Sequence, residues 1–173
     1  AFSPEEQAIM APYLYEPACS PHLAAHMAKR YPDIQHILDC ASKLNEQYDC
    51  LLVEGAGGIY APITETETML DLMKAFGYPV ILVAHRGLGT INHTLLSIEA
   101  IRSAGLALHG IILNETENVE PDYIKQDNPS AIQSFGKTKI LGNIDYLTQL
   151  ETEPDLAWQR FEDCFPTLPR LFD

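Results

Sequence analysis

The sequence has 173 residues, 46% of them hydrophobic and 20% charged, which is enough for a folded domain and excludes a disordered or fibrous chain. Its formal net charge of -13, without a cluster of lysine and arginine, argues against nucleic acid as a partner. No apolar run approaches the roughly 18 residues that a membrane-spanning helix needs, so no membrane partner is expected either.

The first part of the chain predicts helices and one strand. Ser20-Pro21 is a typical helix start and predicts a helix over residues 22–30. Pro32 predicts a second start, followed by an apolar stripe at helical spacing up to Leu44. The apolar run Cys50 to Glu54 predicts a buried strand, and a glycine-rich turn follows it. A helix is then predicted over residues 67–76, with Gly77 as its stop.

The second part alternates strands with helices. Apolar runs predict strands over residues 79–84, 108–114 and 139–144. Helical patterns lie between and after them, over residues 92–104, 122–134 and 153–164. Such alternation predicts an α/β fold with a doubly wound, mainly parallel sheet and helices on both faces, as in P-loop NTPases.

Four polar residues stand at the ends of the predicted strands: Glu54, His85, Asn114 and Asp145. In open α/β sheets, ligands bind outside the carboxyl ends of the strands. Any one of these residues could simply mark where a strand stops. Four of them together favour the rim of an active site.

The segment from Val53 to Pro62, VEGAGGIYAP, is the sharpest local signal. Glycines allow close backbone approach, and the N–H groups of such a turn can hold phosphate oxygens. A carboxylate beside them, here Glu54, is a suitable ligand for Mg²⁺. The alternative is a tight turn with no ligand, which a lone G-A-G-G would favour.

Several segments, in order, resemble dethiobiotin synthetases. The E-G-A-G-G-x-x-x-P signature is present, and SPHLAA from Ser20 resembles the same motif of the family. PVILV from Pro79 and LGTINH from Leu88 resemble its P-V-I-L-V and L-G-x-I-N-H, and the strands ending at Asn114 and Ile144 resemble its adenine-side strands. The resemblance covers about residues 17–147.

The resemblance implies a reaction and its partners. Dethiobiotin synthetases are homodimers that convert 7,8-diaminononanoate, CO₂ and ATP, with Mg²⁺ as cofactor, to dethiobiotin in biotin biosynthesis. Free cysteines in a chain of this size fit a cytoplasmic location.

The resemblance also implies site residues. It makes Glu54 the metal ligand and assigns ATP binding to Glu54, Gly55, Ala56, Gly57, Asn114, Glu115, Asp145, Tyr146 and Leu147. It assigns substrate binding to Gly58, Gly89, Thr90, Ile91, Asn92 and Tyr123, with Asn92 and Tyr123 serving the partner subunit. The family usually has proline where this chain has Asp145.

The family opens with a strand, a phosphate-binding loop, G-x-x-x-x-G-K-[ST], and a helix, and a catalytic lysine and a second Mg²⁺-binding aspartate follow them. Residues 1–19 contain no lysine and no glycine. We therefore expect residues 1–173 to form one α/β domain that is incomplete at its N-terminus, holds no catalytic residue and is inactive alone. The sequence from Ala131 to Gly136-Lys137-Thr138 imitates the loop, but it lies between a predicted helix and a predicted strand rather than after a strand.

Two other functions remain open from the sequence. One is a related P-loop amidoligase of cofactor metabolism, such as a cobyrinic acid amidating enzyme, which shares the V-E-G-A-G strand end. The other is a non-catalytic binding or dimerisation module.

Overall fold

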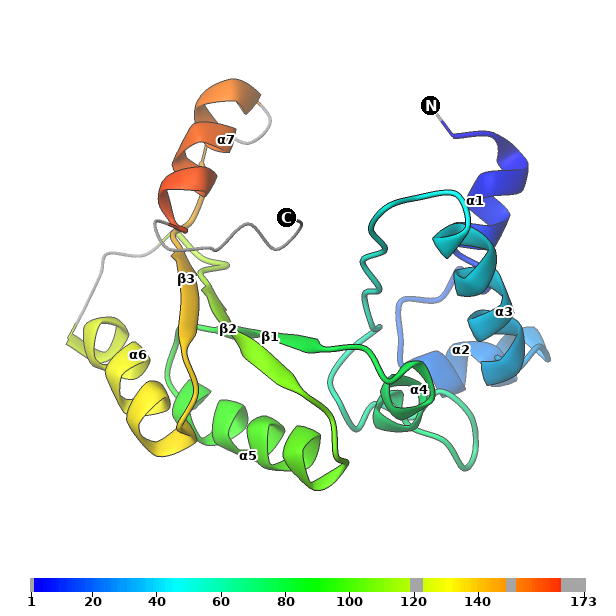
Figure 1. Cartoon of the computed structure of the whole chain (residues 1–173), viewed down its shortest axis with the longest axis horizontal. Helices are drawn as coiled ribbons and strands as arrows, with labels where there is room; N and C mark the ends of the chain where they lie inside the picture. Colours follow the sequence, from blue (N-terminus) through cyan, green and yellow to red (C-terminus); the bar gives the residue numbers. More distant parts are fainter. Residues whose placement is uncertain (1, 119–122, 149–151, 166–173) are drawn as a thin grey trace. The chain divides into compact units, whose positions relative to one another are not determined.

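A computed structural model describes residues 2–118, 123–148 and 152–165 of the chain (Figure 1). The chain divides into two compact units, residues 1–78 and residues 79–173. The single domain expected over residues 1–173 therefore stays a prediction. Along the described ranges, no helix combines the length and apolar character needed to cross a bilayer.

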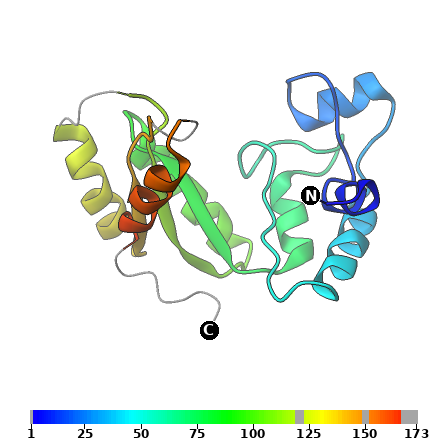
Figure 2. The same ribbon diagram turned by 90° about the horizontal axis from the view of Figure 1, so that it is seen from above.

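The regular structure described in the first unit is mainly helical, and a long loop joins the last two helices. The helices are α1 (Pro4–Met10), α2 (Pro21–Ala28), α3 (Ile34–Asn45) and α4 (Met69–Phe76). Helix α3 packs against α1 and α4 (Figures 1 and 2). Buried side chains of Ile63, Met69 and Leu72 form the core between loop and helices.

The helix starts follow local capping chemistry. Helix α2 begins at Pro21 as predicted, although the Ser20 hydroxyl makes no cap hydrogen bond. Helix α3 begins after Asp33 rather than at Pro32, because the Asp33 carboxylate accepts the Gln35 N–H at 2.9 Å. Helix α1 was not predicted, yet Ser3 and Glu6 form a capping box at its start.

The predicted strand from Cys50 to Glu54 is wrong for this structure. These residues have no strand assignment, and the side chains of Leu52 and Val53 are 84% and 43% exposed. A strand needs a neighbour that pairs with its backbone N–H and C=O groups. Among the described residues of the first unit, the helices and one isolated bridge, Pro62–Thr68, offer none.

The second unit contains the predicted parallel sheet. Its strands are β1 (Val80–His85), β2 (Leu108–Asn114) and β3 (Ile140–Ile144), in the order β1-β2-β3. The register pairs His85 with Asn114 and Asn114 with Ile144, so the three carboxyl ends are level. The α/β class with a parallel sheet is confirmed.

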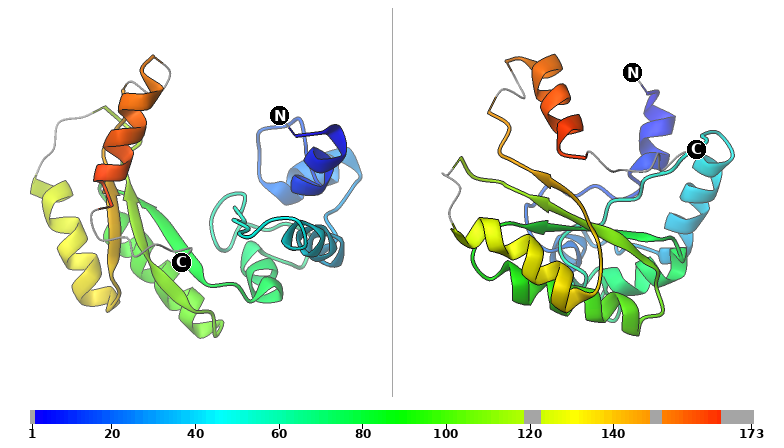
Figure 3. Two further views of the ribbon diagram at one scale, coloured as in Figure 1. Left: turned by 45° about the horizontal axis from the view of Figure 1, so that its top comes forward. Right: turned by 60° about the vertical axis from the view of Figure 1, so that its left-hand side comes forward.

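Helices cover both faces of this sheet (Figure 3). Helices α5 (Thr90–Ser103) and α6 (Tyr123–Gly136) lie side by side on one face, and α7 (Pro154–Asp163) lies on the other. The core on the first face is built from Ile98 of α5, Ile132 of α6, and Ile111 and Leu113 of β2. Residues 111 and 113 of β2 therefore face α5 and α6, whereas residues 112 and 114 alternate to the α7 face.

The predicted position of the imitated phosphate loop, between a helix and a strand, is confirmed. Gly136 ends α6, Lys137 has a left-handed φ of 46°, and β3 starts at Ile140. Arg102 donates to the Lys137 carbonyl at 3.0 Å, which fixes this turn to the end of α5. The turn thus leads into the amino end of β3, away from the carboxyl ends of the strands.

Candidate functional site

The predicted site residues fall in both units. Glu54 to Gly58 belong to the first unit, and all other predicted residues belong to the second. Each group has its own local geometry, built from different elements. No group of three or more His, Cys, Asp or Glu side chains arranged to hold a metal ion occurs in the described ranges.

The glycine loop, residues 54–58, leads into a segment that is fixed to the start of α4. The N–H groups of Met69 and Leu70 donate to the carbonyls of Ala61 and Ile59 at 2.9 and 2.8 Å. A Cβ on Gly55 would lie 3.0 Å from the Met69 sulfur, so a larger residue would disturb this packing. Gly57 has a φ of +83°, a conformation that glycine adopts without steric cost.

The Glu54 carboxylate is exposed at the start of this loop. An accessible carboxylate next to flexible glycine backbone suits Mg²⁺, which binds one or two carboxylates and completes its shell with phosphate oxygens and water. The donor chemistry of this loop therefore fits a Mg²⁺–nucleotide, although Glu54 does not end a strand as predicted.

The second group lies at the carboxyl ends of the three strands, which we call the rim: His85, Asn114 and Ile144 with the residues directly after them. Asn114 ends β2 on the α7 side of the sheet and is half-buried. Arg86, Glu115 and Asp145 follow, and their contacts described below lie on the α6 side. The rim thus has two sides with different contacts.

Glu115 and Lys125 form an ion pair on the α6 side. Their side chains are only 5% and 10% exposed. Burial alone would raise the pKa of Glu115, but the Lys125 ammonium and the N–H groups of Glu117 and Thr116 outweigh it and lower that pKa below its ordinary value. The Glu115 N–H also donates to the Ile144 carbonyl at 2.9 Å, which extends the pairing of β2 with β3.

Arg86 and Asp145 form a second ion pair. The Arg86 side chain is 13% exposed and that of Asp145 is 80% exposed, so a covered cation is neutralised by an anion that reaches in from solvent. The Arg86 carbonyl accepts from the Asn128 amide of α6 at 2.9 Å. The Arg86 Nε is buried without a hydrogen-bond partner among the described residues.

Sequence reasoning missed Arg86, Lys125 and Asn128, which hold this rim. Arg86 lies in a short loop, while Lys125 and Asn128 lie on a helix with a weak apolar pattern. Lys125 and Asn128 are spaced by three residues, and this spacing is the local signal that they share a face of α6.

The turn before α5 contains the residues that were predicted to bind the substrate. Gly89 caps the helix with a φ of 92°. The Thr90 N–H donates to the Gly87 carbonyl at 3.2 Å, whereas those of Ile91 and Asn92 find no acceptor among the described residues. A cavity of about 260 Å³ adjoins this turn and is lined by β1 and α5, including His85, Thr90 and His93.

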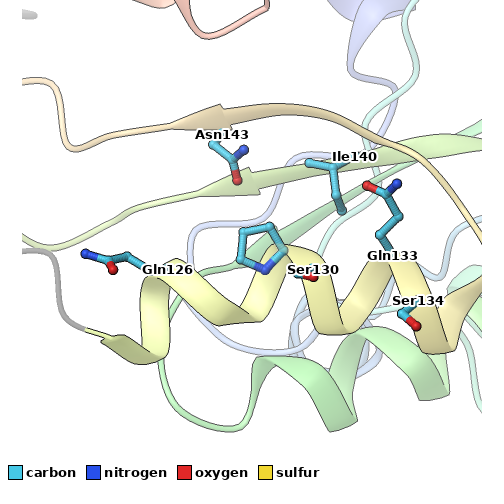
Figure 4. A pocket seen from close by; sticks show the side chains of 7 residues that line it. Gln126, Ser130, Gln133, Ser134, Ile140 and Asn143 are labelled. Atoms are coloured by element: carbon cyan, nitrogen blue, oxygen red, sulfur yellow. The ribbon is translucent and has the colours of Figure 1, made fainter.

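A second cavity, of about 490 Å³, lies between α6 and β3 (Figure 4). Uncharged side chains line it: Gln126, Pro129, Ser130, Gln133, Ser134, Ile140 and Asn143. None of the predicted site residues belongs to it. Tyr123, predicted to serve a partner subunit, is 81% exposed at the start of α6.

Comparison with known proteins gives a family. Residues 2–154 match the family described as "AAA domain". The ATP-dependent dethiobiotin synthetase BioD of Halalkalibacterium halodurans is 41% identical over 141 residues, which cover 81% of this chain and 58% of that protein.

Two further relatives carry similar names. The ATP-dependent dethiobiotin synthetase BioD 2 of Pasteurella multocida is 44% identical over 118 residues, 66% of this chain and 55% of that protein. The BioD protein of Anaeromyxobacter dehalogenans is 36% identical over 148 residues, 86% of this chain and 63% of that protein. The chain thus spans 55 to 63% of the length of these three relatives.

Proposed function

We propose that the protein containing this chain, which belongs to the AAA domain family, is an ATP-dependent dethiobiotin synthetase. The observation that carries the proposal is the 41% identity to a protein of that name over 81% of the chain. The two other functions considered from the sequence, an amidoligase and a non-catalytic module, gain no support from the relatives, which carry the synthetase name.

In this reaction, one amine of 7,8-diaminononanoate attacks CO₂ and loses a proton to give a carbamate. A carbamate oxygen then takes the γ-phosphoryl group of ATP, and ADP leaves. The second amine attacks the same carbon, phosphate leaves, and the ureido ring of dethiobiotin closes. Phosphoryl transfer of this kind depends on positioning and on neutralising charge.

The glycine loop is proposed to bind the phosphate end of the nucleotide. The N–H groups of Gly55, Ala56 and Gly57 would donate to phosphate oxygens, and Gly58 would lie next to the diamine. Glu54 would hold Mg²⁺, which supplies positive charge to the phosphate oxygens. The exposed carboxylate and the left-handed backbone of Gly57 support these roles.

The rim is proposed to bind the adenine base. The Asn114 carboxamide can both donate to and accept from the base edge. Tyr146 lies two residues after Ile144, the residue that pairs with Asn114, and is 44% exposed. Its ring can flank the base, with Leu147 next to it. Glu115 would support this site indirectly, from the α6 side, because its carboxylate is already bound to Lys125 and to backbone N–H groups.

The start of α5 is proposed to bind the substrate carboxylate. The N–H groups of Ile91 and Asn92 lie in the first helical turn, where the helix dipole favours an anion. Gly89 and Thr90 shape this turn.

A homodimer is proposed around the same helix. Leu96 of α5 is 61% exposed and lies four residues after the exposed Asn92, and Leu88, just before the helix, is 89% exposed. Residues spaced by four share one face of a helix. Two copies that bury this face would bring Asn92 of one to the other, and the exposed Tyr123 is available for the same contact. The free cysteines support a reducing, cytoplasmic setting for this enzyme.

The test is carbon fixation by the intact protein. Labelled bicarbonate, ATP, Mg²⁺ and 7,8-diaminononanoate should give labelled dethiobiotin, identified by mass spectrometry. Glu54→Gln should lower kcat/KM by at least about tenfold, because the metal loses a charged ligand. Glu46→Gln, an exposed carboxylate at the end of α3, is the matched control and should leave the rate unchanged. No labelled product from the wild-type protein would refute the proposal.

A further inference from the structure

Three contacts join the tips of all three strands in the second unit. From α6, Lys125 reaches Glu115 after β2, and Asn128 reaches the Arg86 carbonyl after β1. Arg86 in turn reaches Asp145 after β3. A continuous polar chain therefore fixes the rim to one helix.

The Arg86–Asp145 ion pair spans the end of β2. The strand order is β1-β2-β3, so the residues that follow β1 and β3 are separated by the end of β2. Two strand spacings amount to about 10 Å, which a long arginine side chain and an aspartate together can span. The ion pair thus ties the outer strands together past the central one.

The pair lies behind the residue proposed to read the base. Side chains alternate between the faces of a strand, and Ile111 and Leu113 of β2 face α5 and α6. Asn114 therefore points to the opposite side, while Glu115 and the backbone of Arg86 contact α6. The polar chain supports the rim from the α6 side, whereas Asn114 lies on the opposite side of the sheet.

Asp145 also connects the network to the base-flanking segment. It directly precedes Tyr146, and the carboxylate is the partner of a guanidinium that is only 13% exposed. Arg86 is the fixed member of the pair, because its guanidinium is covered and its backbone carbonyl is bound by Asn128. The exposed aspartate, and with it the start of the segment 145–147, is the member that is held.

We propose that Arg86 and Asp145 are positioning residues of the base subsite. Their ion pair holds Tyr146 at a set place relative to Asn114, so that a purine base enters a subsite already formed. The inference rests on the proposed function for the identity of its ligand, and it assigns to Asp145 a role through Arg86 rather than through direct contact with the base.

The test is calorimetric titration of the intact protein with ATP and, separately, with inorganic tripolyphosphate, which lacks the base. Asp145→Asn keeps the size of the side chain and removes its charge. Positioning predicts that it weakens ATP binding about fivefold and leaves tripolyphosphate binding unchanged. Arg86→Ala should have the same effect on ATP, and the double variant should be no weaker than either single variant, because one interaction is lost in all three.

Direct binding of the phosphates by Arg86 would change ligand affinity in the opposite direction. If Arg86 bound the phosphates directly, Asp145→Asn would free its charge and strengthen both ATP and tripolyphosphate binding. That result would overturn the proposal, as would equal weakening of both ligands by Arg86→Ala. Arg102→Ala is the matched control, since it removes the same charge at the other end of the sheet, where Arg102 donates to Lys137. Equal weakening of ATP by Arg102→Ala would also overturn the proposal, because the effect would then follow net charge.

Calorimetry separates this inference from the proposed function. A protein that binds ATP with the predicted response to Asp145→Asn, but forms no dethiobiotin, would refute the function and leave the positioning role in place. If the wild-type protein forms dethiobiotin and Asp145→Asn binds ATP equally well, the positioning role is refuted and the proposed function stays in place. Absence of any ATP binding by the wild-type protein would overturn both.

Discussion

Replacing Lys125 with methionine tests the buried ion pair of the rim. Methionine keeps most of the side-chain volume and the helix propensity of lysine, so the change acts mainly through charge. Removing one partner of a buried pair costs roughly 3–5 kcal/mol, because the other charge stays buried. Here the pair lies at the edge of a sheet, where nearby solvent still screens it. We therefore expect Lys125→Met to lower the free energy of unfolding by about 2–3 kcal/mol at pH 7.

This loss should depend on pH with a defined sign. The pKa of Glu115 is lowered from its ordinary value of 4.5 in the folded protein. Its contribution to stability is thus fully present above pH 4.5 and is lost as the pH falls through the lower, folded-state pKa. Without Lys125, two of the causes that lower the pKa of Glu115 are lost, so this pKa is higher than in the wild type and the carboxyl is neutralised at a higher pH. The difference between wild type and variant should shrink steadily as the pH is lowered from 7 towards 4.

The assay is urea unfolding followed by circular dichroism at several pH values. Lys139→Met is the matched control, because Lys139 is exposed next to β3 and its loss removes the same charge. A loss for Lys125→Met below about 0.5 kcal/mol at pH 7 would contradict the reasoning, since that is the range of ordinary surface changes. A loss of the same size at pH 4 and pH 7 would trace the effect to packing of the lysine stem instead.

Three further predictions concern other parts of the protein. Asn114→Ala should weaken ATP binding about tenfold and diamine binding little, measured by titration with each ligand; equal weakening would indicate a general disturbance of the fold. Gly57→Ala should lower stability by about 1–2 kcal/mol in thermal unfolding, because Gly57 has a φ of +83° and a Cβ there would lie 3.2 Å from that of Ala61. Gly58→Ala, with open space around it and no positive φ, should change stability far less. Light scattering should find a dimer that Leu96→Asp dissociates, and a fully active monomer would contradict the proposed assembly.

The sheet was predictable because each strand carries its own local signal. Residues 108–114 form β2 as predicted, and β1, β3 and the neighbouring helices start or end within one or two residues of their predicted bounds. The polar ends of these strands were also predictable, and the register does place His85, Asn114 and Ile144 level with one another. Whether the side chains at the rim bind a nucleotide stays a prediction.

The partners of the rim were not predictable, for a physical reason. Lys125 and Asn128 act across space, on the tips of strands that lie 10 and 42 positions away in sequence. A lysine on a predicted helix is ordinarily a solvated charge. Its burial follows only from the packing of α6 beside the ends of β1 and β2, which no local pattern encodes.

The segment from Cys50 to Glu54 marks the limit of such reasoning. Its apolar residues are of the same kind as those of β2, yet Leu113 is fully buried whereas Leu52 is 84% exposed. Leu113 is buried because β2 has a strand on each side and helices over the face. An apolar run in the sequence reports only that burial would be favourable, by roughly 1.5–3 kcal/mol for a leucine. That gain is realised only where neighbouring strands also satisfy the backbone N–H and C=O groups. The first unit, as described, contains helices around this run, so its backbone stays in the loop that leads to Glu54 and the glycines.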